Sequence, residues 1–295
     1  MNDKNNPIAQ RIASFHPIYD DGDLLVINNV EVLGAPQVVP FQRNVLALCT
    51  KGMLMGDLND ASLMVRENQV FICPIGSKLA DVSYTSDFQF FAIAMSNVLL
   101  QHYLRDHIES WNQFAYIDKI TVLNMDSNEG IHFFGIIQDL VRILSAPVED
   151  KDEARCRRQM LSFTIQMALI GLSCLLSKKA VVPIEKPLQN VLYFNKFINL
   201  LQHAEKKNNS VEYYASKLCI SPKYLADICK KNSGMTPGQW IREYTVSDIT
   251  HYLLHTDLSM KEISAKLGFS STSFFGKYVK ESLGYTPMKY RKKRK

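Results

Sequence analysis

Apolar positions in the first third of the chain occur in short runs that turn residues separate. The runs between about Asp20 and Met95 are "DLLVINNVEVLG", "NVLALCTKGMLMGDLND", "ASLMVRENQVFICPIG" and "KLADVSYTSDFQFFAIAMS". Runs of this length, bounded by Gly, Pro, Asn and Asp, are typical of β-strands. Their regular spacing predicts a small all-β barrel or sandwich at the N-terminal end.

After Met95 the apolar residues recur at helical spacing. The predicted helices are "SNVLLQHYLRDHIES", "SNEGIHFFGIIQDLVRILSAP" and "EARCRRQMLSFTIQMALIGLSCLLSKK", with Ser96 and Ser127 as N-caps of the first two. The stretch "AVVPIEKP" has two prolines and mixed charge, which indicates a linker, and everything after it has a helical pattern. The fold class is therefore α+β, in three parts: 1–105 (barrel), 106–182 (helical segment) and 183–295 (all-α domain).

One pattern occurs twice in the C-terminal part. "YASKLCISPKYLADICKKNSGMTP" begins at Tyr214, and "ISAKLGFSSTSFFGKYVKESLGYTP" begins at Ile263. An alignment without a gap pairs Leu225 with Phe274, and one extra residue follows before the Gly-x-Thr-Pro that ends each copy. Each copy predicts a short helix, a turn, and a second helix that a serine caps and a glycine closes. This is the sequence pattern of a helix-turn-helix unit.

The second helix of each copy leaves small, polar and basic residues outside its apolar stripe, which in the second copy is predicted to include Phe274 and Phe275. Such residues suit a recognition helix in the major groove, with flanking lysines on phosphates. The alternative is a helical repeat with an ordinary solvated face. The predicted DNA-binding residues are Lys223, Tyr224, Ala226, Asp227 and Lys230 in the first unit and Ser271, Thr272, Ser273, Gly276 and Lys277 in the second.

The segment between the two copies, "TPGQWIREYTVSDITHYLLHTDLS", predicts one long helix. Thr236 caps it, Pro237 begins it, and it ends near His255. Roughly 19 residues at 1.5 Å per residue span about 28 Å, close to the ~34 Å that separates successive turns of the major groove. A rigid spacer of this length can present two recognition helices to one face of DNA.

Charge separates the two ends of the chain. The whole chain carries +5, but residues 208–295 hold 15 Lys and Arg against 7 Asp and Glu, a net +8, which leaves −3 for the rest. A basic module of this kind favours a polyanionic partner. The six scattered cysteines form neither a disulfide framework nor a zinc pattern, and the polar start has no secretory signal, so we expect a reduced, cytoplasmic protein. The apolar stretch "MLSFTIQMALIGLSCLLS" has helical periodicity and predicts a packed helix rather than a membrane span.

The two copies carry a family resemblance. "GFSSTSFFGKYVKESLGYTPMKYRK" resembles the C-terminal signature of AraC/XylS transcription regulators, and "YYASKLCISPKYLADICKKNSGMTP" resembles the family's first helix-turn-helix. The preceding part is similar to the family's cupin-type sensor barrel with its dimerisation helices. The resemblance implies a homodimer that binds promoter double-stranded DNA, responds to a small-molecule effector or partner, and contacts RNA polymerase if it activates. Thr245 and Ile249 depart from the arginine and the alanine that the family often has.

The residues of the predicted barrel indicate whether the protein could be an enzyme and where an effector could bind. Between Asp20 and Met95 there is no histidine, which disfavours a metal-dependent cupin enzyme, so we expect neither metal nor cofactor and no catalytic residues. Arg43 is the candidate effector-binding residue if it points inward; the alternative is that it lies on the outer face of a strand. The alternatives to a regulator are a metal-free cupin-type enzyme and an interaction protein that no longer binds DNA.

Overall fold

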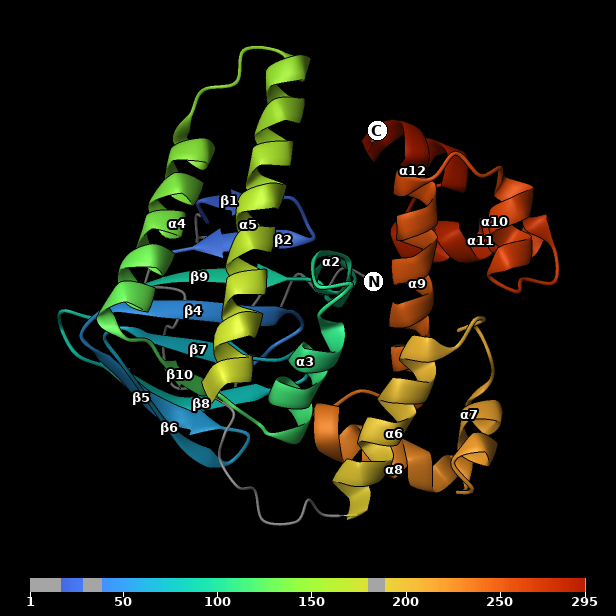
Figure 1. The fold of residues 1–295 in the computed structure, drawn as a ribbon, viewed down its shortest axis with the longest axis horizontal. Helices are drawn as coiled ribbons and strands as arrows, with labels where there is room; N and C mark the ends of the chain where they lie inside the picture. Colours follow the sequence, from blue (N-terminus) through green and yellow to red (C-terminus); the bar gives the residue numbers. More distant parts are fainter. Residues whose placement is uncertain (1–16, 29–38, 180–188, 295) are drawn as a thin grey trace, which may run out of the picture. The chain divides into compact units, whose positions relative to one another are not determined.

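The fold is described by a computed structural model for residues 17–28, 39–179 and 189–294 (Figure 1). The chain forms two compact units. The first holds the described residues up to Ser96 and those from 119 to 179, and the second holds Asn97–Asp118 with the described residues from 189 onward. The predicted linker at 180–187 lies outside the described residues. The grouping of Asn97–Asp118 with the C-terminal part differs from the predicted boundary at 105.

Two antiparallel sheets make up the core of the first unit. Their strands are β1 (Tyr19–Asp20), β2 (Leu24–Ile27), β3 (Val39–Pro40), β4 (Asn44–Lys51), β5 (Met53–Leu58), β6 (Ala61–Arg66), β7 (Gln69–Cys73), β8 (Lys78–Tyr84), β9 (Gln89–Met95) and β10 (Val122–Asn124). The six-stranded sheet has the order β1-β2-β9-β4-β7-β10, and the four-stranded sheet has the order β3-β8-β5-β6. The predicted strands and turns are confirmed from Asn44 to Met95, whereas β10 was not predicted.

The predicted cupin-type barrel is not confirmed. Among the described residues the strands pair into two separate sheets, with β1 and β10 at the edges of one and β3 and β6 at the edges of the other. Closing a barrel needs the edge strands to pair with one another, and strand patterns alone do not determine that pairing. The structure therefore shows an antiparallel sandwich followed by helices, within the α+β class.

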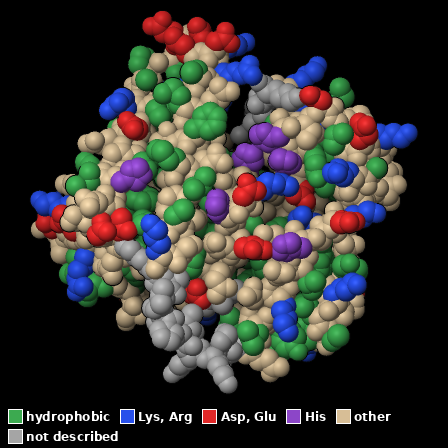
Figure 2. All heavy atoms as spheres, in the orientation of Figure 1, with side chains coloured by type: hydrophobic (Ala, Val, Ile, Leu, Met, Phe, Trp, Pro, Cys, Tyr) green, Lys and Arg blue, Asp and Glu red, His purple; other side chains and the backbone are tan. Residues whose placement is uncertain are grey.

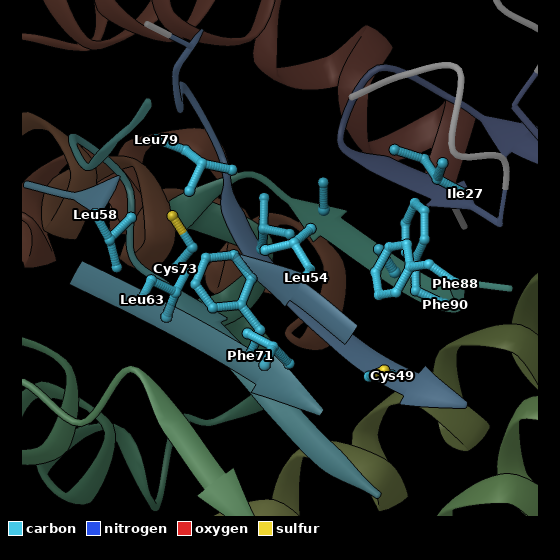
Figure 3. Packing of buried hydrophobic residues seen from close by; sticks show 14 residues of the cluster. Ile27, Cys49, Leu54, Leu58, Leu63, Phe71, Cys73, Leu79, Phe88 and Phe90 are labelled. Carbon is cyan, nitrogen blue, oxygen red and sulfur yellow. The ribbon is translucent and has the colours of Figure 1, made fainter. Parts of the chain in front are cut away.

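The six-stranded sheet is buried on both faces. Val45 and Cys49 of β4 point into a cluster shared with the four-stranded sheet, where Phe71, Phe88 and Phe90 also pack (Figure 3). Alternate residues of the same strands point the other way, toward two helices, because successive side chains of a strand face opposite sides. The residues on that second face are Leu46, Leu48, Val70, Phe91 and Ile93.

Two long helices, α4 (Ser127–Ser145) and α5 (Lys151–Lys179), lie across this second face (Figure 1). The N-cap of α4 is Asp126, which corrects the predicted Ser127; Asp126 and Glu129 form a reciprocal capping box. Helix α5 is long and apolar enough to cross a membrane by length and composition. It buries one stripe in the first unit, at Leu161, Ile165, Leu169, Leu172 and Leu176.

The segment predicted as one helix from Ser96 divides into three pieces, α2 (Asn97–Tyr103), α3 (Ile108–Asn112) and a π-helical turn, η2 (Gln113–Ile117). It leaves the first unit after β9, packs within the second unit, and returns to the sheet at β10. Its apolar periodicity predicted the helical state. It did not predict which unit would bury the apolar residues, because that choice depends on contacts far away in the sequence.

The second unit is otherwise all-helical. Its helices are α6 (Gln189–His203), α7 (Val211–Lys217), α8 (Pro222–Ser233), α9 (Pro237–His255), α10 (Met260–Lys266), α11 (Thr272–Leu283) and α12 (Pro287–Arg294). Both tryptophans of the chain, Trp111 and Trp240, are buried in this unit. Their fluorescence therefore reports on the folding of the second unit.

Cys219 occupies a strained backbone position in the turn between α7 and α8. Its φ is 56°, and glycine takes the same place in the second copy, where Gly268 has a φ of 77°. A non-glycine residue in this region costs roughly 1–2 kcal/mol, partly offset by the greater freedom of glycine in the unfolded chain. We expect Cys219→Gly to raise the free energy of unfolding of the second unit by about 0.5 kcal/mol, measured by urea titration with tryptophan fluorescence.

Gly268→Ala is the matched control. A Cβ at Gly268 would lie 2.8 Å from Cδ of Lys206 and would also adopt the unfavourable φ. We expect this change to destabilise the unit by about 1 kcal/mol or more. Loss of stability in Cys219→Gly would show that the thiol contributes a contact that outweighs the backbone strain.

Candidate nucleic-acid interface

The two helix-turn-helix units share the same tight turn. In the first, the Ile220 amide donates to the Ala215 carbonyl at 3.1 Å; in the second, the Phe269 amide donates to the Ser264 carbonyl at 3.0 Å. The positive φ of Cys219 or Gly268 precedes each of these bonds. The repeat in the sequence is therefore a repeat in backbone geometry.

The serines that begin the recognition helices correct the predicted alignment. Ser221 caps α8 and Ser271 caps α11, each accepting a hydrogen bond from the amide three residues later. The extra residue of the second copy thus lies in its turn rather than after its helix. The structural equivalent of Leu225 is Phe275, and both side chains are fully buried. Phe274 is 49% exposed, so its predicted place in the buried stripe is wrong.

Most of the predicted contact residues lie on the outer surface of α8 and α11. Ala226 and Gly276 are half-buried at equivalent positions. A Cβ built at Gly276 has no neighbour within 4 Å, so the surface over this glycine is open. The exposed members are Lys223, Tyr224, Asp227 and Lys230 in the first helix-turn-helix and Ser271, Thr272, Ser273 and Lys277 in the second helix-turn-helix.

Two of the predicted residues have partners within their own helix. The Ser271 hydroxyl accepts from the Phe274 amide at 3.1 Å and is thereby engaged as the helix cap. The Lys277 ammonium lies 3.9 Å from the Glu281 carboxylate, and both side chains are largely exposed. An exposed pair one helical turn apart contributes only about 0.3–0.5 kcal/mol. Lys277 is therefore free to exchange this partner for a base or a phosphate.

An aromatic residue stands at the same position of each recognition helix. Tyr224 is 40% exposed, and Phe274, its equivalent in α11, is 49% exposed. The Tyr224 ring packs edge-on against Tyr193 of α6 at 6.1 Å. Sequence reasoning missed Phe274 because the gap in the alignment had been placed after the helix. Shifting the register by one residue pairs the two aromatic residues and reveals the shared position.

Helix α9 connects the two helix-turn-helix units and is bonded to both. Thr236 and Gln239 form a capping box at its start, and the Trp240 indole donates to the Ser233 hydroxyl of α8 at 2.8 Å. On the other side, Arg242 donates to the Glu281 carbonyl of α11 at 3.3 Å. The 19 residues of α9 correspond to about 28 Å, as predicted. Contacts to both recognition helices make it a rigid spacer.

The segment Asn97–Asp118 is bonded to the same helix. The Asn112 amide donates to the Tyr244 hydroxyl at 2.8 Å. Asp248 binds Arg105 at 3.3 Å and Lys207 at 2.9 Å. A stretch of chain that precedes α4 therefore forms part of the scaffold that holds the two recognition helices.

Three histidines also meet at this contact. The His102 ring stacks on His255 at 4.9 Å, and His251 stacks on His255 at 5.4 Å. Burial, together with His255, His251 and Arg105, lowers the pKa of His102 to about 4. Burial likewise lowers the pKa of His251. His102 is therefore uncharged at neutral pH, and its ring packs without repelling Arg105.

The remaining predicted site residue, Arg43, lies in the first unit. Its guanidinium donates to the Gly22 carbonyl at 2.9 Å and lies 3.9 Å from the Asp20 carboxylate, with the side chain 28% exposed. It joins the turn after β1 to the start of β4. In the part of the chain that the structure describes, no three His, Cys, Asp or Glu side chains are placed to hold a metal ion.

Comparison with known proteins covers mainly the helix-turn-helix region. The family described as a helix-turn-helix domain matches residues 214–293. Regulatory protein PocR from Salmonella typhimurium is 33% identical over 81 residues, which are 28% of this chain and 27% of PocR. The transcriptional activator RhaR from Cronobacter sakazakii is 26% identical over 81 residues, 28% of this chain and 29% of RhaR.

The similarity to whole proteins is limited. The chain spans less than a third of the length of PocR and of RhaR. A crystal structure of apo ToxT from Vibrio cholerae aligns over 92% of this chain and 98% of ToxT, at 15% identity and a TM-score of 0.38, too low to assign the first unit to a fold family. The paired turns, the caps and the matched residues all lie in the second unit, and the C-terminal part of this chain is a helix-turn-helix domain of the AraC type.

Proposed function

We propose that this chain is a sequence-specific DNA-binding transcription regulator that acts on promoter DNA in the cytoplasm. The observation that carries the proposal is the pair of capped recognition helices, α8 and α11, whose exposed polar faces are held by one rigid helix. The relatives named PocR and RhaR are themselves regulators. This function needs no catalytic residue, and contact with RNA polymerase belongs to it only if the protein activates.

Binding to genomic DNA tests the proposal directly. Purified protein should retard a small subset of genomic fragments in a gel-shift assay and keep them bound in the presence of excess non-specific DNA. Equal retardation of all fragments would indicate a non-specific binder. No retardation would favour the alternative of an interaction protein that no longer binds DNA.

Lys277 offers a test of base reading within α11. Its side chain is exposed on the outer surface of the helix, next to the open surface at Gly276. We expect Lys277→Ala to weaken the binding free energy for the specific site by about 1–3 kcal/mol, because the contact between the lysine and a guanine forms only at that site. The measurement is the affinity for a confirmed promoter and for a scrambled fragment. Equal weakening of both would assign Lys277 to a phosphate.

The first unit is the proposed sensor, and it contains a small apolar space. An apolar space of about 50 Å³ lies between the six-stranded sheet and α4 and α5. This volume is far below the ~300 Å³ of the smallest common ligand sites, so an effector bound there would have to separate the helices from the sheet. Arg43 remains the proposed polar contact for an effector in this unit.

We also propose that the protein is a dimer through the outer surface of α4 and α5. Leu169 and Leu172 of α5 are buried against the six-stranded sheet of their own chain, so they do not form this surface. Other apolar side chains on these helices remain exposed, and hydrophobic side chains gather over α4 and α5 in Figure 2. The exposed set is Ile131, Phe134, Met160, Phe163 and Met167.

Phe163 is the sharpest probe of this dimer because its side chain is 69% exposed in the single chain. We expect Phe163→Asp to convert a dimer to a folded monomer, since an unpaired charge in an apolar interface costs several kcal/mol. Light scattering at micromolar concentration is the measurement. Leu169→Asp is the contrast, because a charge at this buried position should unfold the first unit. A wild-type monomer would contradict the proposal.

A further inference from the structure

A polar pocket lies at the surface of the second unit. Its volume is about 320 Å³, within the range of small-molecule sites. One wall comes from α3 and η2, and the other from α6. The lining residues are Glu109, Ser110, Asn112, Gln113, Phe114, Asn195, Ile198, Asn199 and Gln202.

Side-chain amides dominate this lining. Asn195, Asn199 and Gln202 follow one another at four and three residues along α6, which places them on one face of the helix. Among the described residues their side chains have no hydrogen-bond partner. On the opposite wall, Asn112 donates to Tyr244 and Gln113 donates to Asp118, so these two amides are held in place. The cavity therefore combines amides of fixed position with amides that are available to a ligand.

The charge of the lining limits what the cavity can bind. Glu109 is the one ionisable lining residue, and it lies 3.2 Å from His203. Among the described residues, the lining has no Lys or Arg to hold an anion. An apolar ligand would take water away from the amides without replacing their hydrogen bonds, which costs free energy for each group.

The amides and the apolar lining residues of the cavity are complementary to one class of molecule. An amide both donates and accepts hydrogen bonds, as a hydroxyl does, and Phe114 and Ile198 are the apolar residues of the lining. We propose that this cavity binds a neutral, hydroxyl-rich ring compound of the size of a monosaccharide or cyclic polyol. Its hydroxyls would form hydrogen bonds with Asn195, Asn199 and Gln202, and its C–H face would pack on Phe114 and Ile198.

The position of the cavity gives such a ligand a structural effect. One wall belongs to Asn97–Asp118, which leaves and re-enters the first unit, and the other belongs to α6, which begins the C-terminal part. A ligand that bonds both walls stabilises the packing of this segment in the second unit. This site is distinct from any effector site in the first unit.

Binding is tested with the full-length protein and without DNA, so the result is independent of the proposed function. A panel of neutral monosaccharides, disaccharides and cyclic polyols is titrated at up to about 10 mM, ten times the Kd of a millimolar complex. We expect at least one member to bind in calorimetry, and Asn195→Leu and Asn199→Leu each to weaken it at least about tenfold. Gln189→Leu, at an exposed amide of α6 outside the cavity, should leave the affinity unchanged.

Tryptophan fluorescence checks that each variant is folded, since Trp111 and Trp240 both lie in this unit. Absence of binding across the panel would overturn the proposal. So would a ligand whose affinity is the same in both α6 variants and the wild type. Displacement of the bound compound by short neutral peptides at lower concentration would assign the cavity to a peptide and would also overturn it.

Discussion

Alanine at Thr272, Ser273 and Lys277 is expected to abolish the sequence preference of this protein for its promoter. All three side chains lie exposed on α11, and the surface beside Gly276 is open to a base edge. Hydroxyls bond either base of a pair, and a lysine reaches guanine. Because each good base contact contributes about 1–3 kcal/mol of discrimination, removal of the set leaves phosphate binding alone.

The matched experiment is alanine at Lys223, Tyr224 and Asp227 of α8. These side chains are equally exposed, but Asp227 must enter the strongly negative field of the phosphates, so it adds little net affinity. We expect this variant to bind more weakly yet to keep much of its sequence preference. Its remaining affinity should also depend less on salt, because it has lost a lysine that neutralises a phosphate.

The two variants are compared on one confirmed promoter and one scrambled fragment, each at two salt concentrations. Loss of preference in the α8 variant, with preference kept in the α11 variant, would contradict the assignment and make Asp227 a base-reading residue. Phe274→Ala and Tyr224→Ala extend the comparison, since these aromatic side chains occupy equivalent exposed positions.

Asp248→Ala is expected to destabilise the second unit strongly. Asp248 lies on α9 with its side chain 11% exposed, and it holds Arg105 and Lys207 from two other parts of the second unit. Its removal leaves the Lys207 ammonium, 14% exposed, without its carboxylate. Breaking a buried pair costs about 3–5 kcal/mol, and we expect about 3 kcal/mol because Arg105 is 40% exposed and regains water.

Urea unfolding followed by tryptophan fluorescence measures this change. Asp106→Ala is the control, because Asp106 is exposed beside Arg105 and forms no ion pair within the described chain; its effect should stay within about 0.5 kcal/mol. Asp248→Asn should be intermediate, since an amide keeps a hydrogen-bond acceptor but not the charge. A loss below about 1 kcal/mol in Asp248→Ala would show that the segment Asn97–Asp118 packs without this ion pair.

The helix-turn-helix units were predictable because their determinants are local. The cap Ser221, the closing glycines Gly234 and Gly284, and the cap Thr236 of α9 occur at the predicted places with the predicted geometry. Caps, turns and helical periodicity depend on residues within a few positions of one another. The strands between Asn44 and Met95 were predictable for the same reason.

The errors have two causes, one local and one that depends on contacts distant in sequence. The prediction for Phe274 is wrong because the alignment places the extra residue after the helix instead of before it. A shift of one residue rotates every position around the helix axis by about 100°. The apolar stripe that includes Leu169 and Leu172 predicts that one face of the helix is covered, but it does not predict which part of the protein covers it. The structure covers these leucines with the six-stranded sheet.

By itself, the sequence determined the repeated unit, its basic charge and most of the residues on its outer face. The tertiary structure decided three further points: that the strands form two sheets instead of a closed barrel, that Asn97–Asp118 belongs to the second unit, and that five amides line one cavity. The physical reason is the separation along the sequence of the residues that interact. Local geometry follows from the backbone and its nearest side chains, whereas strand closure, segment docking and cavities arise from packing between residues tens of positions apart.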